Sequence, residues 1–327
     1  MNQANTRITR LLAGTCLAAA MLLPNTASAT IWRTDQGVQL SGLYVFGDSL
    51  SDSGNIAIAT GGAVPSAAAG YYAGRFSNGP IYLDYIANAF NLHNTAALAG
   101  GTNFAFGGAK IDAATLPNPP GLLAQGQLYL QQLAGHAADP NALYVVYGGG
   151  NDINDPNVSL STSISNLSLL IGALINQGAR NIVVPNAPDL GRTPGNNGNP
   201  ATAALKHNRS VAFNTMLGGA IAGLESAFNI DIIEADVFGL SSHILDNPGL
   251  YGLSDVTDAC LSAGGACANP SQYFYWDSIH PTAGMHQLFG ESIIAQIDAA
   301  AVPVPPTSWL ISFGLVGLWQ LRRYRRS

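Results

Sequence analysis

Charged side chains are scarce in this chain of 327 residues, where they make up 10% of the total, and basic side chains are the scarcer kind. Between residues 30 and 320 there are seven lysines and arginines against nineteen aspartates and glutamates. Proteins that bind nucleic acid need Lys and Arg clustered against the phosphates. The central region is therefore a poor partner for nucleic acid, and an anionic bilayer would repel it as well.

The first 29 residues have the three parts of a secretory signal peptide. Arg7 and Arg10 provide a positive start, Leu11–Leu23 is apolar, and Ala27-Ser28-Ala29 fits a cleavage site. A buried N-terminal helix is the alternative, but this segment has no polar face. We expect signal peptidase to remove residues 1–29 and the protein to be exported to the cell envelope or the medium.

The last 26 residues, 302–327, also have three parts: a Pro-rich stretch, the mostly apolar run Trp309–Leu321, and an arginine cluster. Thirteen helical residues span about 20 Å, less than the ~30 Å of a bilayer core. The segment is thus a marginal, transient membrane anchor with its arginines on the cytoplasmic side. It resembles the PEP-CTERM sorting signals, which implies an exosortase-like processing enzyme and a Gram-negative bacterium. Val304 and Pro306 depart from the commonest form of that signal, and a simple membrane tail is the alternative.

Cysteine is rare, with three residues in the whole chain. Cys16 belongs to the predicted signal peptide, which leaves Cys260 and Cys267 in a loop rich in glycine and alanine. An even count in an exported protein predicts a disulfide, which would contribute about 2–3 kcal/mol. A metal site is the alternative, but no histidine or third cysteine lies near by. No other cluster has metal-ligand spacing, so neither a metal nor a cofactor is expected.

Short runs rich in Ile, Val and Tyr alternate with helical segments, which predicts βαβ units around a parallel sheet. The expected strands are Leu43–Phe46, Asn103–Phe106, Leu143–Tyr147, Asn181–Val184 and Ile230–Glu234. The expected helices lie near Gly79–Phe90, Leu122–Leu133, Ser159–Gln177, Ala201–Phe228 and Pro281–Ala299. The strands lack polar alternation, as in sheets covered on both faces. Right-handed crossovers then give a single α/β domain, residues 30–301, with a flavodoxin-like three-layer α/β/α architecture.

Ser49 follows the first predicted strand in Phe46-Gly47-Asp48-Ser49-Leu50. It therefore lies at the carboxyl end of a strand, where α/β proteins bind ligands. Gly47 permits a sharp turn there, and Asp48 and Asp52 are expected to cap the helix that follows. A serine hydroxyl is a poor nucleophile on its own, so this interpretation requires a base and an oxyanion site.

Asp277 and His280 are suited to supply the base. They are three residues apart, so one tight turn can bring the carboxylate and the imidazole side by side. Pro281 fits the first position of the helix that follows. Asn151, after the strand Leu143–Tyr147, offers a side-chain amide to an oxyanion.

A backbone N–H from the segment Asn103–Ala109 is a second oxyanion donor, with Gly108 preferred and the adjacent Gly107 as the alternative. Asp152 is expected to orient the loop that carries Asn151. The remaining histidines have no carboxylate at matching spacing and are predicted to be surface or structural residues: His93, His136, His207, His243 and His286.

These segments, in this order, resemble the GDSL family of esterases and lipases, also called SGNH hydrolases. The loop Pro188–Pro194 also resembles one that is common in the secreted branch of the family. The resemblance implies that Ser49 is the nucleophile and that Asp277 and His280 complete the triad. Its oxyanion donors would be Gly108, Asn151 and the backbone N–H of Ser49. The implied activity is hydrolysis of carboxylic esters through an acyl-enzyme, without a cofactor.

The substrate stays open between simple esters, lipids including phospholipids, and acetylated polysaccharides. An alcohol that replaces water in the second step would make the protein an acyltransferase. The rival from another class is a non-catalytic surface protein that binds glycan or matrix on the same fold. Loss of Ser49, Asn151, Asp277 or His280 would favour that rival, and all four are present.

Overall fold

The computed structural model describes residues 33–34 and 37–300. The predicted signal peptide, residues 1–29, and the predicted sorting segment, residues 302–327, lie outside the described residues. Within the described ranges, no helix combines the length and the apolar character that crossing a bilayer requires.

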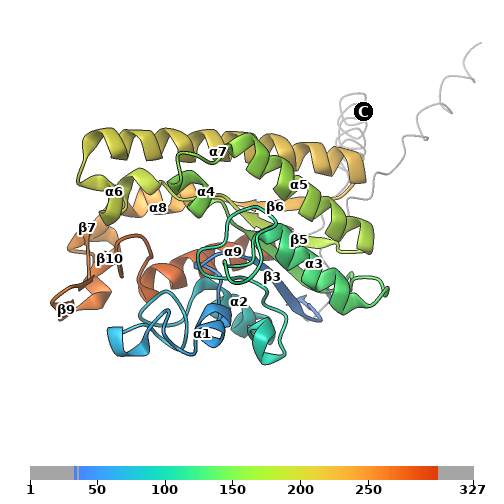
Figure 1. Cartoon of the computed structure of the whole chain (residues 1–327). Coiled ribbons are helices and arrows are strands. Elements are labelled where there is room, and N and C mark those ends of the chain that lie inside the picture. The colour runs from blue at the N-terminus through green and yellow to red at the C-terminus, as the bar shows by residue number, and fades with distance from the viewer. Residues whose placement is uncertain (1–32, 35–36, 301–327) are drawn as a thin grey trace, which may run out of the picture.

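A parallel sheet of four strands forms the centre of the domain (Figure 1). The strands are β3 (Leu43–Gly47), β4 (Leu143–Tyr147), β5 (Asn181–Pro185) and β6 (Ile232–Ala235), hydrogen-bonded in the order β3-β4-β5-β6. Every residue of β4 and β5 is buried, as expected for strands covered on both faces. All four strands overlap predicted ones, and the α/β class is confirmed.

The predicted strand Asn103–Phe106 is wrong as a regular strand. The segment runs along β3 and donates hydrogen bonds to its carbonyl groups, but only Asn103 forms β-bridges, one of them with Val45. Side chains account for the difference. Asn103 Oδ1 accepts from the N–H of Ala105 at 2.9 Å, and Asn55 Nδ2 donates to the carbonyls of Asn103 and Ala105. These side-chain bonds replace the regular ladder.

The segment still completes the topology. Counted as the second strand along the chain, it gives the order 2-1-3-4-5, which is that of flavodoxin-like folds. In that topology β3 and β4 flank the switch point, where the connections leave in opposite directions and a crevice forms. Gly47 pairs with Tyr147 in the register, so both strands end at this crevice.

Helices cover both faces of the sheet. The first layer consists of α3 (Leu122–Leu133), α5 (Leu160–Gln177) and α7 (Pro200–Phe228), packed on Tyr144 and Val146. The second consists of α2 (Tyr82–Ala89), α8 (Val237–Asp246) and α9 (Ala283–Ala300), packed on Leu143, Val145 and Tyr147. Figure 1 shows α3, α5 and α7 on one side of the sheet and α2 on the other. The three-layer architecture is confirmed.

Helix α9 begins at Ala283, two residues later than predicted. Pro281 is not its first residue but forms an antiparallel bridge with Tyr275. The N–H of Thr282 donates to the carbonyl of Phe274 at 2.9 Å. This pairing keeps the chain extended beyond His280 and delays the helix.

Several short elements were not predicted, because they carry too few residues for a periodic pattern. They are the helices α4 (Gly150–Asn154) and α6 (Pro194–Asn197), the 3-10 turns Ala67–Ala69, Ala97–Ala99, Leu190–Arg192, Pro248–Tyr251 and Pro270–Gln272, and the strands β1 (Arg33–Thr34), β2 (Gly37–Val38), β8 (Leu261–Ser262), β9 (Gly265–Ala266) and β10 (Tyr273–Tyr275). Helix α1 (Asn55–Ala59) is the short helix expected after Ser49. Strand β7 (Asp255–Ala259) is as long as β3 but lacks an apolar run, and it was missed. Helix α8 is long enough to have been predicted and was missed.

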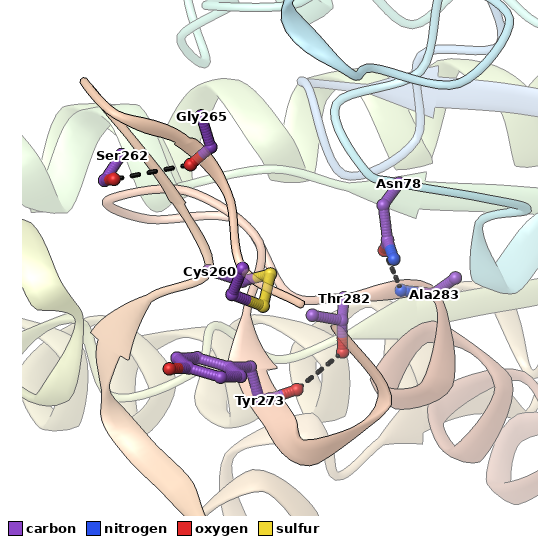
Figure 2. The surroundings of a disulfide bond; sticks show 8 residues. Asn78, Cys260, Ser262, Gly265, Tyr273, Thr282 and Ala283 are labelled. Carbon is purple, nitrogen blue, oxygen red and sulfur yellow. Dashed lines mark hydrogen bonds between the residues drawn. A yellow bond between two sulfur atoms is a disulfide. The ribbon is translucent and has the colours of Figure 1, made fainter. Parts of the chain in front are cut away.

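The structure joins Cys260 and Cys267 in a disulfide that closes the β8–β9 hairpin, as the sequence predicts (Figure 2). The N–H of Cys260 donates to the carbonyl of Tyr275 at 3.1 Å. In the same region, Thr282 Oγ1 donates to the carbonyl of Tyr273 at 2.9 Å, and Asn78 Oδ1 accepts from the N–H of Ala283 at 2.8 Å. The hairpin thus supports the strand that leads to Asp277.

Candidate active site

Ser49 lies in a turn that starts directly after β3. The N–H groups of Ser51 and Asp52 donate to the carbonyl of Asp48 at 3.1 and 3.0 Å, which closes the turn around Ser49. Glycine is needed at position 47 because the backbone of Tyr147 lies so close that a Cβ would stand 2.5 Å from its carbonyl oxygen. The turn leaves Ser49 9% exposed at the edge of the crevice.

Asp52 caps α1 as expected: its Oδ1 accepts from the N–H groups of Gly54 and Asn55 at 2.8 and 2.7 Å. The expectation for Asp48 was wrong, because it accepts from Leu50 N–H at 3.1 Å inside the turn and does not reach the helix. Burial raises the pKa of Asp48 to about 6.

The structure brings Ser49, His280 and Asp277 into one hydrogen-bonded chain. His280 Nε2 lies 2.7 Å from Ser49 Oγ, and His280 Nδ1 lies 2.7 Å from Asp277 Oδ2. Asp277 Oδ1 accepts from the N–H groups of Ile279 and His280 at 2.9 and 2.8 Å. The tight turn between Asp277 and His280 therefore fixes the carboxylate and the ring together. A neutral imidazole whose Nδ1–H points at Asp277 leaves Nε2 free to accept the hydroxyl proton of Ser49.

The Asp277 carboxylate is strongly held in its charged form. Burial alone would raise its pKa, but the charge of His280 and the hydrogen bonds from His280 and Ile279 lower the pKa to about 2. Asp277 therefore stays ionised at every pH well above 2.

Two aromatic residues that the sequence analysis did not identify contact this pair. Tyr71 Oη donates to Asp277 Oδ2 at 2.7 Å, and the ring of Phe76 lies against the His280 imidazole with 5.0 Å between centroids. Burial and the hydrogen bond to Asp277 raise the pKa of Tyr71 above its ordinary value, so its phenol remains a donor. The loop that precedes α2 thus fixes the orientation of both the carboxylate and the imidazole.

The proposed oxyanion donors lie on two neighbouring segments. Asn151 Nδ2 donates one hydrogen to the carbonyl of Ala109 at 2.8 Å, which orients the amide and leaves its second hydrogen for a ligand. The N–H of Gly107 donates to Asp52 Oδ2 at 2.8 Å, whereas the N–H of Gly108 has no acceptor among the described residues. The geometry therefore favours Gly108 over Gly107. A φ of +81° at Gly108 explains why glycine occupies this position.

A family model described as GDSL-like lipase/acylhydrolase matches residues 43–293, well over half of the chain. The chain belongs to this family. The GDSL esterases and lipases are serine hydrolases that act on esters, and this protein is an enzyme of that class.

Similar proteins include a GDSL esterase/lipase of Arabidopsis thaliana, 27% identical over 80% of this chain and 90% of the relative. The esterase EstA of Pseudomonas aeruginosa is 28% identical over 90% of this chain and 50% of its own length. The phosphatidylcholine-sterol acyltransferase of Aeromonas hydrophila is 29% identical over 71% of this chain and 68% of its own. Among solved structures, an aryl esterase of M. smegmatis is 15% identical with a TM-score of 0.42, over 79% of this chain and 99% of that one.

Asp152 of this GDSL hydrolase makes contacts that fit the supporting role predicted for it. Its carboxylate accepts from the Ile111 N–H at 3.1 Å and from Ser163 Oγ at 2.6 Å, which ties the loop before α3 to α4 and α5. The neighbouring Asn151 is held in place by this bracing.

Two histidines have partners that the sequence does not reveal. His207 does have a carboxylate partner, since its Nδ1 lies 2.7 Å from Asp189 Oδ2. The two residues stand 18 positions apart on different elements, so no local spacing reveals the pair. His286 was predicted to be a surface or structural residue, and it is structural: it is buried, and its Nδ1 accepts from the Tyr82 N–H at 3.4 Å. It remains a structural residue that packs α9 on α2.

Proposed function

We propose that this GDSL hydrolase is an exported carboxylic-ester hydrolase with Ser49, His280 and Asp277 as its catalytic triad. The observation that carries the proposal is the hydrogen-bonded chain between these side chains, two of which lie 231 residues apart in the sequence. Ser49 Oγ attacks the acyl carbon while His280 Nε2 takes its proton. The proton then passes to the leaving alcohol, and water cleaves the acyl-enzyme with His280 again as the base.

The negative charge of the tetrahedral intermediate is placed on the oxygen that faces Asn151, Gly108 and the backbone N–H of Ser49. Donors that are already oriented need no reorganisation when that charge forms, which is why they accelerate the reaction. The hydrogen bond from Asn151 to Ala109 supports this role, because it fixes the amide before substrate arrives.

Labelling with a fluorophosphonate tests the nucleophile. Ser49 should be modified in the parent protein, and Ser49→Ala should be neither labelled nor active. Ser53→Ala is the matched control, since Ser53 lies four residues away, is equally buried and makes no hydrogen bond through its Oγ among the described residues. It should keep both labelling and activity. Modification of another serine in the parent would reject the triad.

Acyl transfer is the second candidate, favoured by the similarity to the Aeromonas acyltransferase. The acyl-enzyme can react with an alcohol in place of water, with His280 as the base in both cases. Addition of an acceptor alcohol to the assay distinguishes the two, because a transferase forms a new ester while a hydrolase releases free acid.

Export and sorting complete the proposal: signal peptidase removes residues 1–29, and an exosortase-like enzyme acts on the anchor in residues 302–327 in the envelope of a Gram-negative bacterium. The Cys260–Cys267 disulfide supports an oxidising destination. Mass spectrometry of the mature protein tests the first cleavage, which should leave Thr30 as the N-terminus.

A further inference from the structure

A pocket with a cavity volume of about 50 Å³ opens at the catalytic centre. Its mouth is formed by partly exposed residues, among them Asn151, Pro188 and His280. The pocket is also lined by four buried side chains from the side of the sheet that α2, α8 and α9 cover. They are Tyr147, Leu245, Phe274 and Phe289, each at most 5% exposed. The pocket therefore extends from Ser49 into the interior, between the end of β4 and the helices α8 and α9.

The inner part of this pocket is apolar. Leu245, Phe274 and Phe289 present only carbon, and Tyr147 Oη is the one polar atom of these four, without a hydrogen-bond partner among the described residues.

Tyr275 also lines the pocket, and its Oη has no hydrogen-bond partner among the described residues. Several other polar side chains of the lining are bonded within the protein. Ser241 Oγ donates to the Phe238 carbonyl at 3.1 Å, and Thr193 Oγ1 donates to the Leu190 carbonyl at 2.9 Å. Asp189 accepts from the Gly191 N–H and from His207, and Asp48 lies next to Ser49, at the reacting end. A ligand in the inner pocket thus meets a surface that favours hydrocarbon over a sugar or another polar group.

The two halves of an ester have different requirements at such a site. The alcohol must leave the enzyme before water can attack the acyl-enzyme, whereas the acyl group stays bonded to Ser49 through both steps. The buried part of the pocket, which Leu245 and Phe289 line, suits the half that stays. The partly exposed mouth beside His280 suits the half that leaves.

From this geometry, and on the basis of the triad proposed above, we infer that the inner pocket binds the acyl chain of an aliphatic ester longer than acetate. The side chains of α8 that line the pocket set the acyl-chain length that the enzyme prefers. The alcohol half of the ester lies at the mouth, so the enzyme discriminates only weakly between different alcohols. Acetylated polysaccharides, whose acyl group leaves the inner pocket empty, are poor substrates.

Helix α8 offers variants of opposite effect and a matched control. Leu245 and Ser241 are four residues apart, so they lie on the same face, and both line the pocket. Leu245→Ala deepens the pocket, and Ser241→Leu narrows it. Ile244 is equally buried on the same helix but does not line the pocket, so Ile244→Val changes the core without changing the pocket.

The experiment measures kcat/KM for a series of nitrophenyl esters from acetate to dodecanoate, and for a second series with one acyl group and different alcohols. In the parent, kcat/KM should rise about three- to fourfold for each methylene that enters the pocket and then level off. Leu245→Ala should move this plateau to longer chains and Ser241→Leu to shorter ones. Ile244→Val should keep the parent profile, and the alcohol series should vary little in all four proteins.

The inference is overturned by a parent that prefers acetate, or by pocket variants that melt like the parent and keep its chain-length profile. A strong dependence on the alcohol that shifts in the α8 variants would assign the pocket to the other half of the ester. Fluorophosphonate labelling of the same samples separates this result from failure of the triad. Labelled Ser49 with an unchanged profile rejects the acyl pocket alone, whereas absence of labelling at Ser49 rejects the proposed function.

Discussion

Replacement of Asp48 by asparagine should stabilise this hydrolase at pH 8 but not at pH 4. Asp48 is 3% exposed beside the nucleophile, and burial raises the pKa of its carboxyl from 3.8 to about 6. The folded protein therefore binds this proton more tightly than the unfolded chain does. Asparagine has nearly the same shape and keeps an oxygen that can accept from the Leu50 N–H, but it is never ionised.

The sign and the size of the effect follow from the two pKa values. Below pH 3.8 the carboxyl is neutral in both the folded and the unfolded state, so its burial does not lower the free energy of unfolding. Between pH 3.8 and about 6 the unfolded state loses the proton first, so the stability of the folded parent falls as the pH rises. A difference of about two pKa units corresponds to roughly 3 kcal/mol, fully developed above pH 6.

Urea unfolding of the parent and of Asp48→Asn at both pH values measures this difference. The advantage of the variant should be about 3 kcal/mol larger at pH 8 than at pH 4. Asp84→Asn is a control of opposite sign. Burial alone would raise the pKa of Asp84, but hydrogen bonds from Arg75 at 2.7 and 2.8 Å lower it, so this variant should lose more stability at pH 8 than at low pH.

The contrary result is a stability difference between Asp48→Asn and the parent that is the same at both pH values while Asp84→Asn responds as expected. That result would mean that Asp48 is solvated in the folded protein, for instance through the mouth of the pocket.

Three further changes test the site and the chain end. Asn151→Ala should lower kcat about 10²–10³-fold with a smaller effect on KM, because its amide meets charge mainly in the transition state; a change confined to KM would make it a substrate-binding residue. Tyr71→Phe should lower kcat about tenfold and move the acid limb of the pH–rate profile upward, since one donor to the Asp277 carboxylate is lost; an unchanged pH profile would leave Tyr71 a packing role only. Deletion of residues 302–327 should release active enzyme as soluble product from cells; a large loss of melting temperature and activity would show that the segment belongs to the fold.

Local sequence patterns determined most of the fold. The strands of the central sheet and the long helices were predicted because each is covered by neighbouring layers and therefore carries an apolar or periodic signal. Asn103–Phe106 carries the same apolar signal and still fails as a strand. The carbonyls of Asn103 and Ala105 accept from Asn55, a side chain from another part of the chain, which no local pattern shows.

The site divides in the same way. The contact of Asp277 with His280 was predictable because the two residues are three positions apart in one turn. Ser49 and Asn151 were predictable because each follows a strand, and the two strands end at the same edge of the sheet. Tyr71 and Asp277 are 206 residues apart, so their hydrogen bond exists only when the loop before α2 packs against the one after β10.

The buried state of Asp48 and the apolar pocket under α8 also belong to the tertiary structure alone. A local pattern records what a residue does within its own helix or strand. Burial and electrostatic environment are instead sums over every element packed around a group, and only the assembled layers define them.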